Sequence, residues 1–234
     1  MKNRICSVLL MALSASAFAG RPLTTEDAGF IDKGGVELET YYHRQTERDT
    51  AALSGFHIQP SVGIGFRTQL GIGVDFLRQY NEDFEKRKST GEYALVGKTG
   101  IKELTDDAYG LAVAYGVDRT RAAGERFRYD NANINGALTV PLDKWLFHAN
   151  LGWQRSRLAG VTATTWALAA ERTEALGPVD LAIETFGNDH DPAWLQVAAR
   201  WTVREDCVFL DASYGVQTGS TRAKQLTLGF KLAF

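Results

Sequence analysis

Stretches in which apolar and polar residues alternate recur along most of the chain, and the clearest of them is the stretch 226–234. Every second residue there is leucine or phenylalanine, whereas the residues between them are Thr227, Gly229, Lys231 and Ala233. Side chains alternate across a β-strand with a period of two residues. The stretch is therefore expected to form one strand with an apolar face and a small or polar face.

Twelve segments of this kind are separated by turn-forming or charged residues. Connections after the even-numbered segments are short, whereas those at 46–55, 81–91 and 119–128 are longer and more charged. Short turns at one end and longer loops at the other are typical of outer-membrane barrels. The pattern predicts an all-β fold, a transmembrane antiparallel up-and-down β-barrel over residues 34–234. Its strands are expected at 35–45, 56–66, 70–80, 92–102, 109–118, 129–140, 145–155, 162–172, 179–187, 193–203, 208–217 and 223–234.

Pro60 is the one irregular position that bears on this assignment, because it lies inside the second segment and has no backbone donor. Proline in a strand is found mainly at edges, strand starts and bulges. We therefore expect a bulge or a late strand start at Pro60.

Alternation does not decide which face of the barrel is outside, because a soluble lipocalin-like barrel alternates with its apolar face inward. Trp145 and Trp153 share a face eight residues apart. In a tilted strand this corresponds to roughly 20 Å, which is close to the separation of two interfacial aromatic girdles. The other aromatic residues expected near strand ends on the apolar face are Tyr42, Tyr80, Tyr93, Tyr214, Trp201 and Phe234. This placement favours an apolar face toward lipid and a polar face toward a lumen.

The first residues are typical of a cleaved export signal. Lys2 and Arg4 precede a mostly apolar stretch, 5–18, which is too short to span a bilayer. The motif Ala17-Phe18-Ala19 that follows is a cleavage site. Residues 1–19 are therefore expected to be a signal peptide, and the mature chain is expected to start at Gly20.

The composition of the mature chain narrows the function classes further. Without Lys2 and Arg4, 24 of the 26 basic residues remain against 28 acidic ones. There is no basic excess to contact phosphates, so nucleic acid is not an expected partner. Cleavage also removes Cys6 and leaves Cys207 alone, so no internal disulfide is expected.

Two stretches resemble known outer-membrane proteins. The strand that ends at Phe230 and Phe234 is similar to the C-terminal signal strand of bacterial outer-membrane barrels, which implies recognition by the barrel-assembly machinery. Residues 21–29, R-P-L-T-T-E-D-A-G, lead into G-G-V-E-L-E at 34–39. This opening resembles a transporter-like outer-membrane family named for the meta-cleavage pathway of phenol degradation. The resemblance implies a Gram-negative outer-membrane barrel that takes up small, in part aromatic, compounds.

The stretch 20–33 has turn and capping residues but no strand period, so it is expected to be a periplasmic N-terminal arm. Two interpretations remain open. Arg21, Glu26 and Asp27 either pair with lumen charges and partly plug the inner mouth, or belong to a flexible tail.

The polar faces of the strands define the candidate site. A charged side chain facing lipid costs about 2–4 kcal/mol for Lys or Arg at mid-membrane, so these residues are expected to face a lumen. Twelve strands lie between the eight that leave a filled interior and the sixteen that leave an aqueous channel, which predicts a narrow lumen. The lumen-lining candidates are Glu37, Glu39, Arg67, Asp75, Lys98, His148, Asp180, Glu184, Arg200, Asp211 and Lys231.

Two of these candidates carry sharper predictions. Closure of the barrel is expected to bring Lys231 close to Glu37 or Glu39 across the first and last strands. Counting back from the turns predicts that Arg200 lies opposite both Asp180 and Asp211. The arrangement is expected to be either a lock on the strand register or part of a solute-selecting constriction.

The sequence favours a narrow, porin-like channel or transporter for small solutes, embedded among outer-membrane lipid and lipopolysaccharide. The alternatives are an outer-membrane lipid-modifying hydrolase and a structural barrel without transport activity. His43 and His57 are both expected to point inward near the outer end, where they form either a two-histidine metal or catalytic site or structural lumen histidines. None of the four histidines lies in a recognisable catalytic motif. No catalytic residue, cofactor or metal is therefore predicted.

Overall fold

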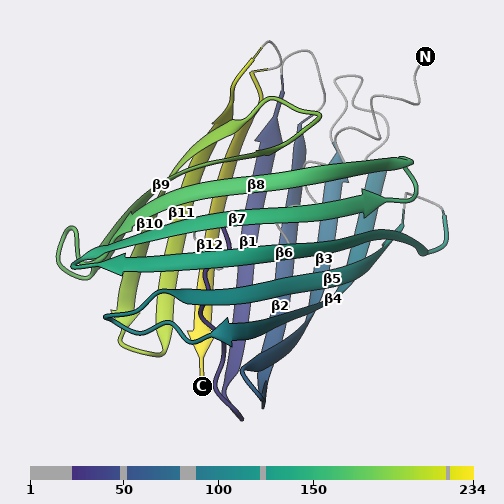
Figure 1. Cartoon of the computed structure of the whole chain (residues 1–234). Helices are drawn as coiled ribbons and strands as arrows, with labels where there is room; N and C mark the ends of the chain where they lie inside the picture. The colour runs from purple at the N-terminus through teal and green to yellow at the C-terminus, as the bar shows by residue number, and fades with distance from the viewer. Residues whose placement is uncertain (1–22, 48–51, 80–87, 122–124, 220–221) are drawn as a thin grey trace.

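The computed structural model describes residues 23–47, 52–79, 88–121, 125–219 and 222–234. Twelve antiparallel strands form a closed barrel in which each strand pairs with its chain neighbours and β1 pairs with β12 (Figure 1). The strands are β1 (Val36–Thr46), β2 (Leu53–Gly65), β3 (Thr68–Gln79), β4 (Lys88–Lys102), β5 (Gly110–Arg121), β6 (Arg128–Leu142), β7 (Trp145–Ser156), β8 (Val161–Arg172), β9 (Val179–Asn188), β10 (Trp194–Arg204), β11 (Val208–Gln217) and β12 (Lys224–Ala233). The predicted all-β, twelve-stranded barrel is confirmed. The expected signal peptide, Arg21 and Tyr80 lie outside the described residues.

Pro60 does not interrupt its strand, so the expectation of a bulge or a late start there is wrong. β2 begins at Leu53, and Pro60 pairs with Leu38 of β1. On the other side, the ladder to β3 skips Gln59 and Pro60 and resumes at Ser61 in the same register. The missing donor is accommodated by this local gap in pairing, whereas the register shift of β2 comes later, at its turn with β3.

The outer surface of the barrel is apolar. Large hydrophobic side chains along the strands are exposed, among them Leu151 at 67 %, and Trp145, Trp153 and Tyr93 are exposed on the same surface. Most of the buried charged and polar side chains lie at alternate strand positions and face the interior. This distribution is opposite to that of a lipocalin-like barrel, so the soluble alternative is excluded. No helix in the described part of the chain is long and apolar enough to cross a membrane.

Candidate functional site

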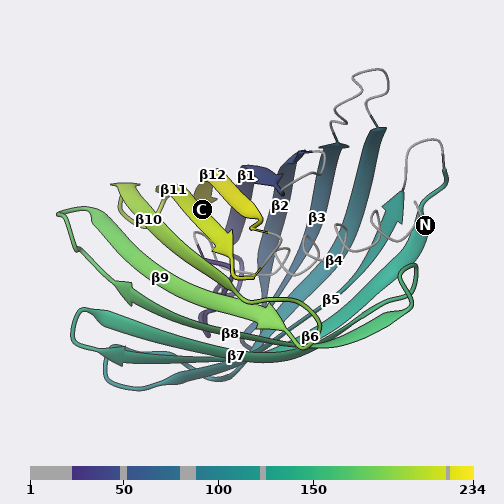
Figure 2. The same ribbon diagram turned by 90° about the horizontal axis from the view of Figure 1, so that it is seen from above.

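The N-terminal arm, residues 23–35, runs through the barrel interior before β1 begins. Leu23, Thr25, Glu26 and Ala28 are all buried, and each lies against the inner wall through contacts described below. In the view from above, the purple arm lies on the inner side of the strand wall (Figure 2). Of the two interpretations of this stretch, the structure shows the one in which the arm enters and fills part of the lumen.

The first turn of the arm is anchored by Glu184 on β9. The Glu184 carboxylate accepts hydrogen bonds from Thr24 N at 2.7 Å, Thr25 N at 2.8 Å and Thr25 Oγ1 at 2.6 Å. Gln196 Nε2 on β10 donates a fourth hydrogen bond at 2.6 Å. Glu184 is only 2 % exposed. A buried carboxylate needs such donors in place of water, so the arm and this wall residue satisfy each other.

The middle of the arm is held by side chains of other strands. Glu26 N donates to Asn150 Oδ1 at 2.7 Å, and Asn150 Nδ2 donates back to Glu26 O at 2.8 Å, so one amide serves both backbone groups. Ala28 N donates to Thr139 Oγ1 at 2.9 Å, and this hydroxyl also bonds His148 Nδ1. Residues 23–31 of the arm lie outside the described strand ladders, and these side chains supply hydrogen bonds that their backbone requires.

Lys98 on β4 neutralises the acidic pair of the arm. Its Nζ lies 2.8 Å from Glu26 Oε1 and 3.1 Å from Asp27 Oδ1, and the Lys98 and Glu26 side chains are almost fully buried. Burial raises the pKa of Glu26 to about 7, against the smaller opposing effect of Lys98. Burial also opposes ionisation of Asp27, but the charges of Lys98 and Lys231 hold its pKa well below its usual range. Asp27 is therefore the ionised partner of Lys98 across neutral pH, and Glu26 titrates near neutrality.

Glycines shape the wall where the arm passes closest. A Cβ at Gly63 would lie 2.0 Å from Asp32 O, and a Cβ at Gly100 would lie 2.6 Å from the Phe30 ring. Neither contact leaves room for a side chain, because real Cβ atoms essentially never approach so closely. Close backbone approach is a common reason for glycine within a strand. The wall is therefore complementary to this arm in shape as well as in hydrogen bonding.

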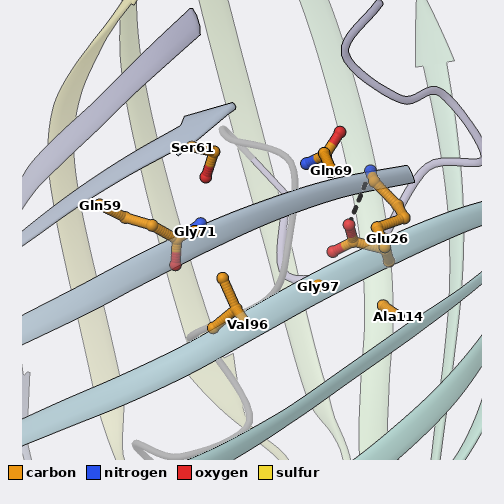
Figure 3. Close-up of a pocket in the computed structure, with 9 residues that line it drawn as sticks. Glu26, Gln59, Ser61, Gln69, Gly71, Val96, Gly97 and Ala114 are labelled. Carbon is orange, nitrogen blue, oxygen red and sulfur yellow. Dashed lines mark ion pairs between the residues drawn. The ribbon is translucent and has the colours of Figure 1, made fainter. Parts of the chain in front are cut away.

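A small cavity remains between the arm and the wall of β2 to β5 (Figure 3). Its water-accessible volume is about 20 Å³, which is enough for a single water molecule. The cavity is lined by Glu26, Gln59, Ser61, Gln69, Gly71, Val96, Gly97, Lys98 and Ala114. The lining is mainly polar, so the gap left by the arm suits water or a small polar group.

The predicted contact across the closing strands is present. Lys231 Nζ lies 2.8 Å from Glu37 Oε2 and 3.8 Å from Glu39 Oε1, and Lys231 pairs directly with Glu39 in the ladder. The three residues therefore link β1 and β12 on the lumen side.

The predicted register around Arg200 is also present, but the ion pairs differ from the expectation. Arg200 pairs with Asp180 in one ladder and with Asp211 in the other. Its Nε donates to Asp211 Oδ1 at 3.0 Å. Asp180 Oδ1 instead accepts a hydrogen bond from Glu174 N, at 2.7 Å, in the turn between β8 and β9. The guanidinium is therefore bonded to one of the two carboxylates rather than held between both.

Arg67 is the candidate that the structure contradicts. It lies in the exposed turn between β2 and β3 with a φ of 55°, and its Nη1 donates to Ile101 O at 3.3 Å. The prediction assumes that the alternation of β2 continues as far as Arg67, but the chain has already turned there. Arg67 is therefore a turn residue and does not line the lumen.

The end of the barrel that carries the longer loops contains a second group of lumen residues. His57 Nδ1 lies 2.7 Å from Asp75 Oδ2, and His43 Nε2 lies 4.0 Å from Asp75 Oδ1. Within the described part of the chain, no group of three or more His, Cys, Asp or Glu residues is arranged to hold a metal ion. Asp118 and Asp130 also lie buried here.

Sequence reasoning did not include Thr139, Asp118 or Asp130 among the inward residues. Asp118 follows the inward parity of its strand and was detectable from the alternation. Asp130 could not be assigned from the alternation, because the register between β5 and β6 shifts between Val117 and Arg119. The shift changes which residues at the start of β6 face the lumen.

The barrel and the arm in its lumen can now be compared with known proteins. No protein-family model matches the chain, and no curated protein matches it. Among solved structures, the COG4313 outer-membrane channel from Pseudomonas putida F1 superimposes with a TM-score of 0.58 at 12 % identity, covering 89 % of this chain and 98 % of that one. A KdgM porin in complex with disordered oligogalacturonate gives 0.56 at 11 % identity, covering 84 % and 99 %. The translocator domain of the autotransporter NalP from Neisseria meningitidis gives 0.55 at 11 % identity, covering 100 % and 96 %.

These proteins share a fold and little sequence with this chain. The chain therefore has the twelve-stranded fold of bacterial outer-membrane β-barrels, a fold that channels and autotransporter domains both use. The narrower family suggested by the opening residues is not confirmed by any family model.

Proposed function

We propose that this protein is an outer-membrane channel or transporter for small solutes in which the N-terminal arm forms the constriction. The observation that carries the proposal is the way the arm is held. It crosses the lumen on hydrogen bonds and ion pairs to Glu184, Asn150, Thr139 and Lys98, in an interior lined by polar side chains.

A purely structural barrel has no need of such an interior. An eight-stranded barrel encloses a core that is filled by its own side chains. This barrel is wider, and the additional interior space holds the polar arm and the residues that bind the arm. The buried apolar cluster around Leu23 contains only alanines besides Leu23 itself, and Ile31 is a further apolar side chain that the arm buries.

The resemblance of residues 21–29 to the meta-cleavage pathway family supports the same role. Thr24, Thr25, Glu26 and Asp27 belong to that motif, and these are the residues that contact the inner wall. The solutes proposed from the resemblance are small compounds, aromatic ones among them. The proposed surroundings are outer-membrane lipid and lipopolysaccharide, with insertion by the barrel-assembly machinery through the strand that contains Phe230 and Phe234.

Planar-bilayer recording together with liposome swelling tests the proposal. The purified mature chain is expected to give discrete conductance steps and to admit small solutes into liposomes at rates that fall with solute size. Bilayers that receive detergent alone serve as the control. Absence of both current and swelling, together with release of fatty acids from phospholipid, would replace the channel with the hydrolase.

A further inference from the structure

A row of four carboxylates lines the lumen at the loop-bearing end, away from the arm. Asp75, Glu92, Asp118 and Asp130 lie on the four adjacent strands β3, β4, β5 and β6. Asp75 pairs directly with Glu92 in one ladder, and Glu92 pairs with Thr120 in the next. Thr120 Oγ1 lies 3.4 Å from Asp118 Oδ1 and 3.5 Å from Asp130 Oδ2, so the row is continuous.

Three members of the row have partners. Asp75 bonds His57, Asp118 accepts a hydrogen bond from Asn131 N, and Asp130 accepts one from Ser156 Oγ. Along the described chain, none of the four carboxylates pairs with a lysine or an arginine.

Glu92 differs from the other three members of the row in its contacts. It is 7 % exposed, lies between Asp75 and Thr120, and makes no hydrogen bond or ion pair within the described residues. The carboxyl groups of Asp118, Asp75 and Asp130 act on it as like charges. A carboxylate removed from water and surrounded by like charges is costly, so it either takes up a proton or is met by a cation or a donor. Within the part of the chain that the structure describes, no basic side chain or hydrogen-bond donor meets Glu92.

The spacing of the row decides which cation suits it. Neighbouring strands lie about 4.8 Å apart, so the carboxylates extend along the wall and do not converge on one point. This agrees with the lack of a metal-binding group of three in the described residues. A linear organic cation with several ammonium groups along its length meets successive carboxylates in turn. Rings and rows of Asp and Glu are a common basis of cation selection in pores.

We propose that the row of Asp75, Glu92, Asp118 and Asp130 binds small linear organic cations with more than one ammonium group, Glu92 supplying the central unpaired carboxylate. The row is a binding site at the loop-bearing mouth, and passage of the bound cation rests on the channel function proposed above. Glu92 and Asp118 act together because their strands are adjacent, so removal of both charges is expected to abolish binding.

The test is a titration of the full mature chain in detergent micelles with spermidine, followed by calorimetry at low ionic strength. Saturable binding is expected for the parent, at least tenfold weaker binding for Glu92→Gln, and none for Glu92→Gln with Asp118→Asn. Glu174→Gln removes the same charge from an exposed turn and is expected to bind like the parent. Glu92→Gln removes an unpaired charge and is expected to fold, which the shift of the folded band on unheated gels checks.

Three results would overturn the inference. They are the absence of saturable spermidine binding to the parent, equal binding by Glu92→Gln, and binding of Mg²⁺ without spermidine. The channel proposal is tested separately from the cation site. Spermidine binding in a protein without conductance would keep the cation site and remove the channel, whereas conductance without spermidine binding would do the reverse.

Discussion

The two halves of the lumen differ in how their charged side chains are paired. In the half filled by the arm, the described charges are matched: Lys98 with Glu26 and Asp27, Arg200 with Asp211, and Glu184 with hydrogen-bond donors of the arm and of β10. In the half near the longer loops, the described partners of the four carboxylates are histidines, hydroxyl groups and backbone N–H groups.

This difference separates a structural role from a binding role. Matched buried charges hold one geometry, and they penalise any movement that separates them. Carboxylates without a basic partner leave an electrostatic field that attracts cations from outside. On the two proposals made above, the arm half stays closed at rest and the loop half attracts cations.

Removal of Lys98 is expected to have the largest effect on the matched half. Lys98→Met leaves the buried Glu26 and the partly exposed Asp27 without their cation, at a cost of roughly 3–5 kcal/mol. The arm is expected to leave the lumen, which exposes the bond after Glu26 to a glutamate-specific protease. Lys102→Met on the same strand, where the ammonium lies over the Tyr109 ring, is the matched control. Equal cleavage of the two variants would show that the ion pairs do not hold the arm.

Arg200 distinguishes a structural lock from a solute-selecting residue. Arg200→Ala leaves the buried Asp211 carboxylate without its charged donor and is expected to cost about 2–3 kcal/mol in unfolding. Ion selectivity is expected to stay unchanged, because the guanidinium is engaged by the wall. Arg204→Ala at the end of the same strand is the control. A changed selectivity with an unchanged unfolding midpoint would favour the constriction.

Glu184→Gln tests the anchor of the arm with a smaller change. An amide offers one acceptor where the carboxylate offers two, so some of the donors from Thr24, Thr25 and Gln196 lose their acceptor. The expected loss is about 1–3 kcal/mol of arm attachment, seen as faster protease cleavage after Glu26. Glu174→Gln in the exposed turn provides the comparison. Unchanged arm cleavage with Glu184→Gln would contradict the anchor.

The last expected effect is that of pH on the arm. Burial raises the pKa of Glu26 to about 7 when the arm is inserted, and the released arm has the ordinary value of 4.5. The inserted state therefore binds the proton more tightly, and attachment weakens as pH rises from about 4.5 to 7 and then levels off. Protease cleavage within the arm at Lys33 is expected to follow this curve. Glu26→Gln should flatten it, and a parent curve that is already flat would remove Glu26 as its source.

Much of the wall follows from the sequence, because strand alternation and turn positions fix an antiparallel register. The pairs Arg200 with Asp180 and Asp211, and Lys231 with Glu39, were predictable in this way. Alternation does not predict which way a side chain points where the strand is no longer regular. Arg67 lies past a strand end, and Asp130 follows a register shift that no sequence period marks.

The path of the arm was not predictable by the same reasoning. The arm has no strand period, and its anchor Glu184 lies 160 residues away from Thr24 in the chain. Which wall residue meets which arm residue depends on the curvature of the closed barrel and on the close approaches at Gly63 and Gly100. Acidic residues in the arm and a lysine on the polar face indicated that an ion pair could form. That Lys98 is the partner follows only from the closed three-dimensional barrel.

The most direct test of the arm as the constriction is the single-channel conductance of a variant that lacks residues 23–31. Residues 32–35 are kept because their backbone bonds tie the arm to β2, through Gly34 N to Gly63 O. A disulfide between Phe30→Cys and Gly100→Cys, in a Cys207→Ser background, locks the arm and is the matched control. The account predicts at least twofold higher conductance for the shortened chain than for the parent, and no increase for the locked chain. Equal conductance in all three would contradict it.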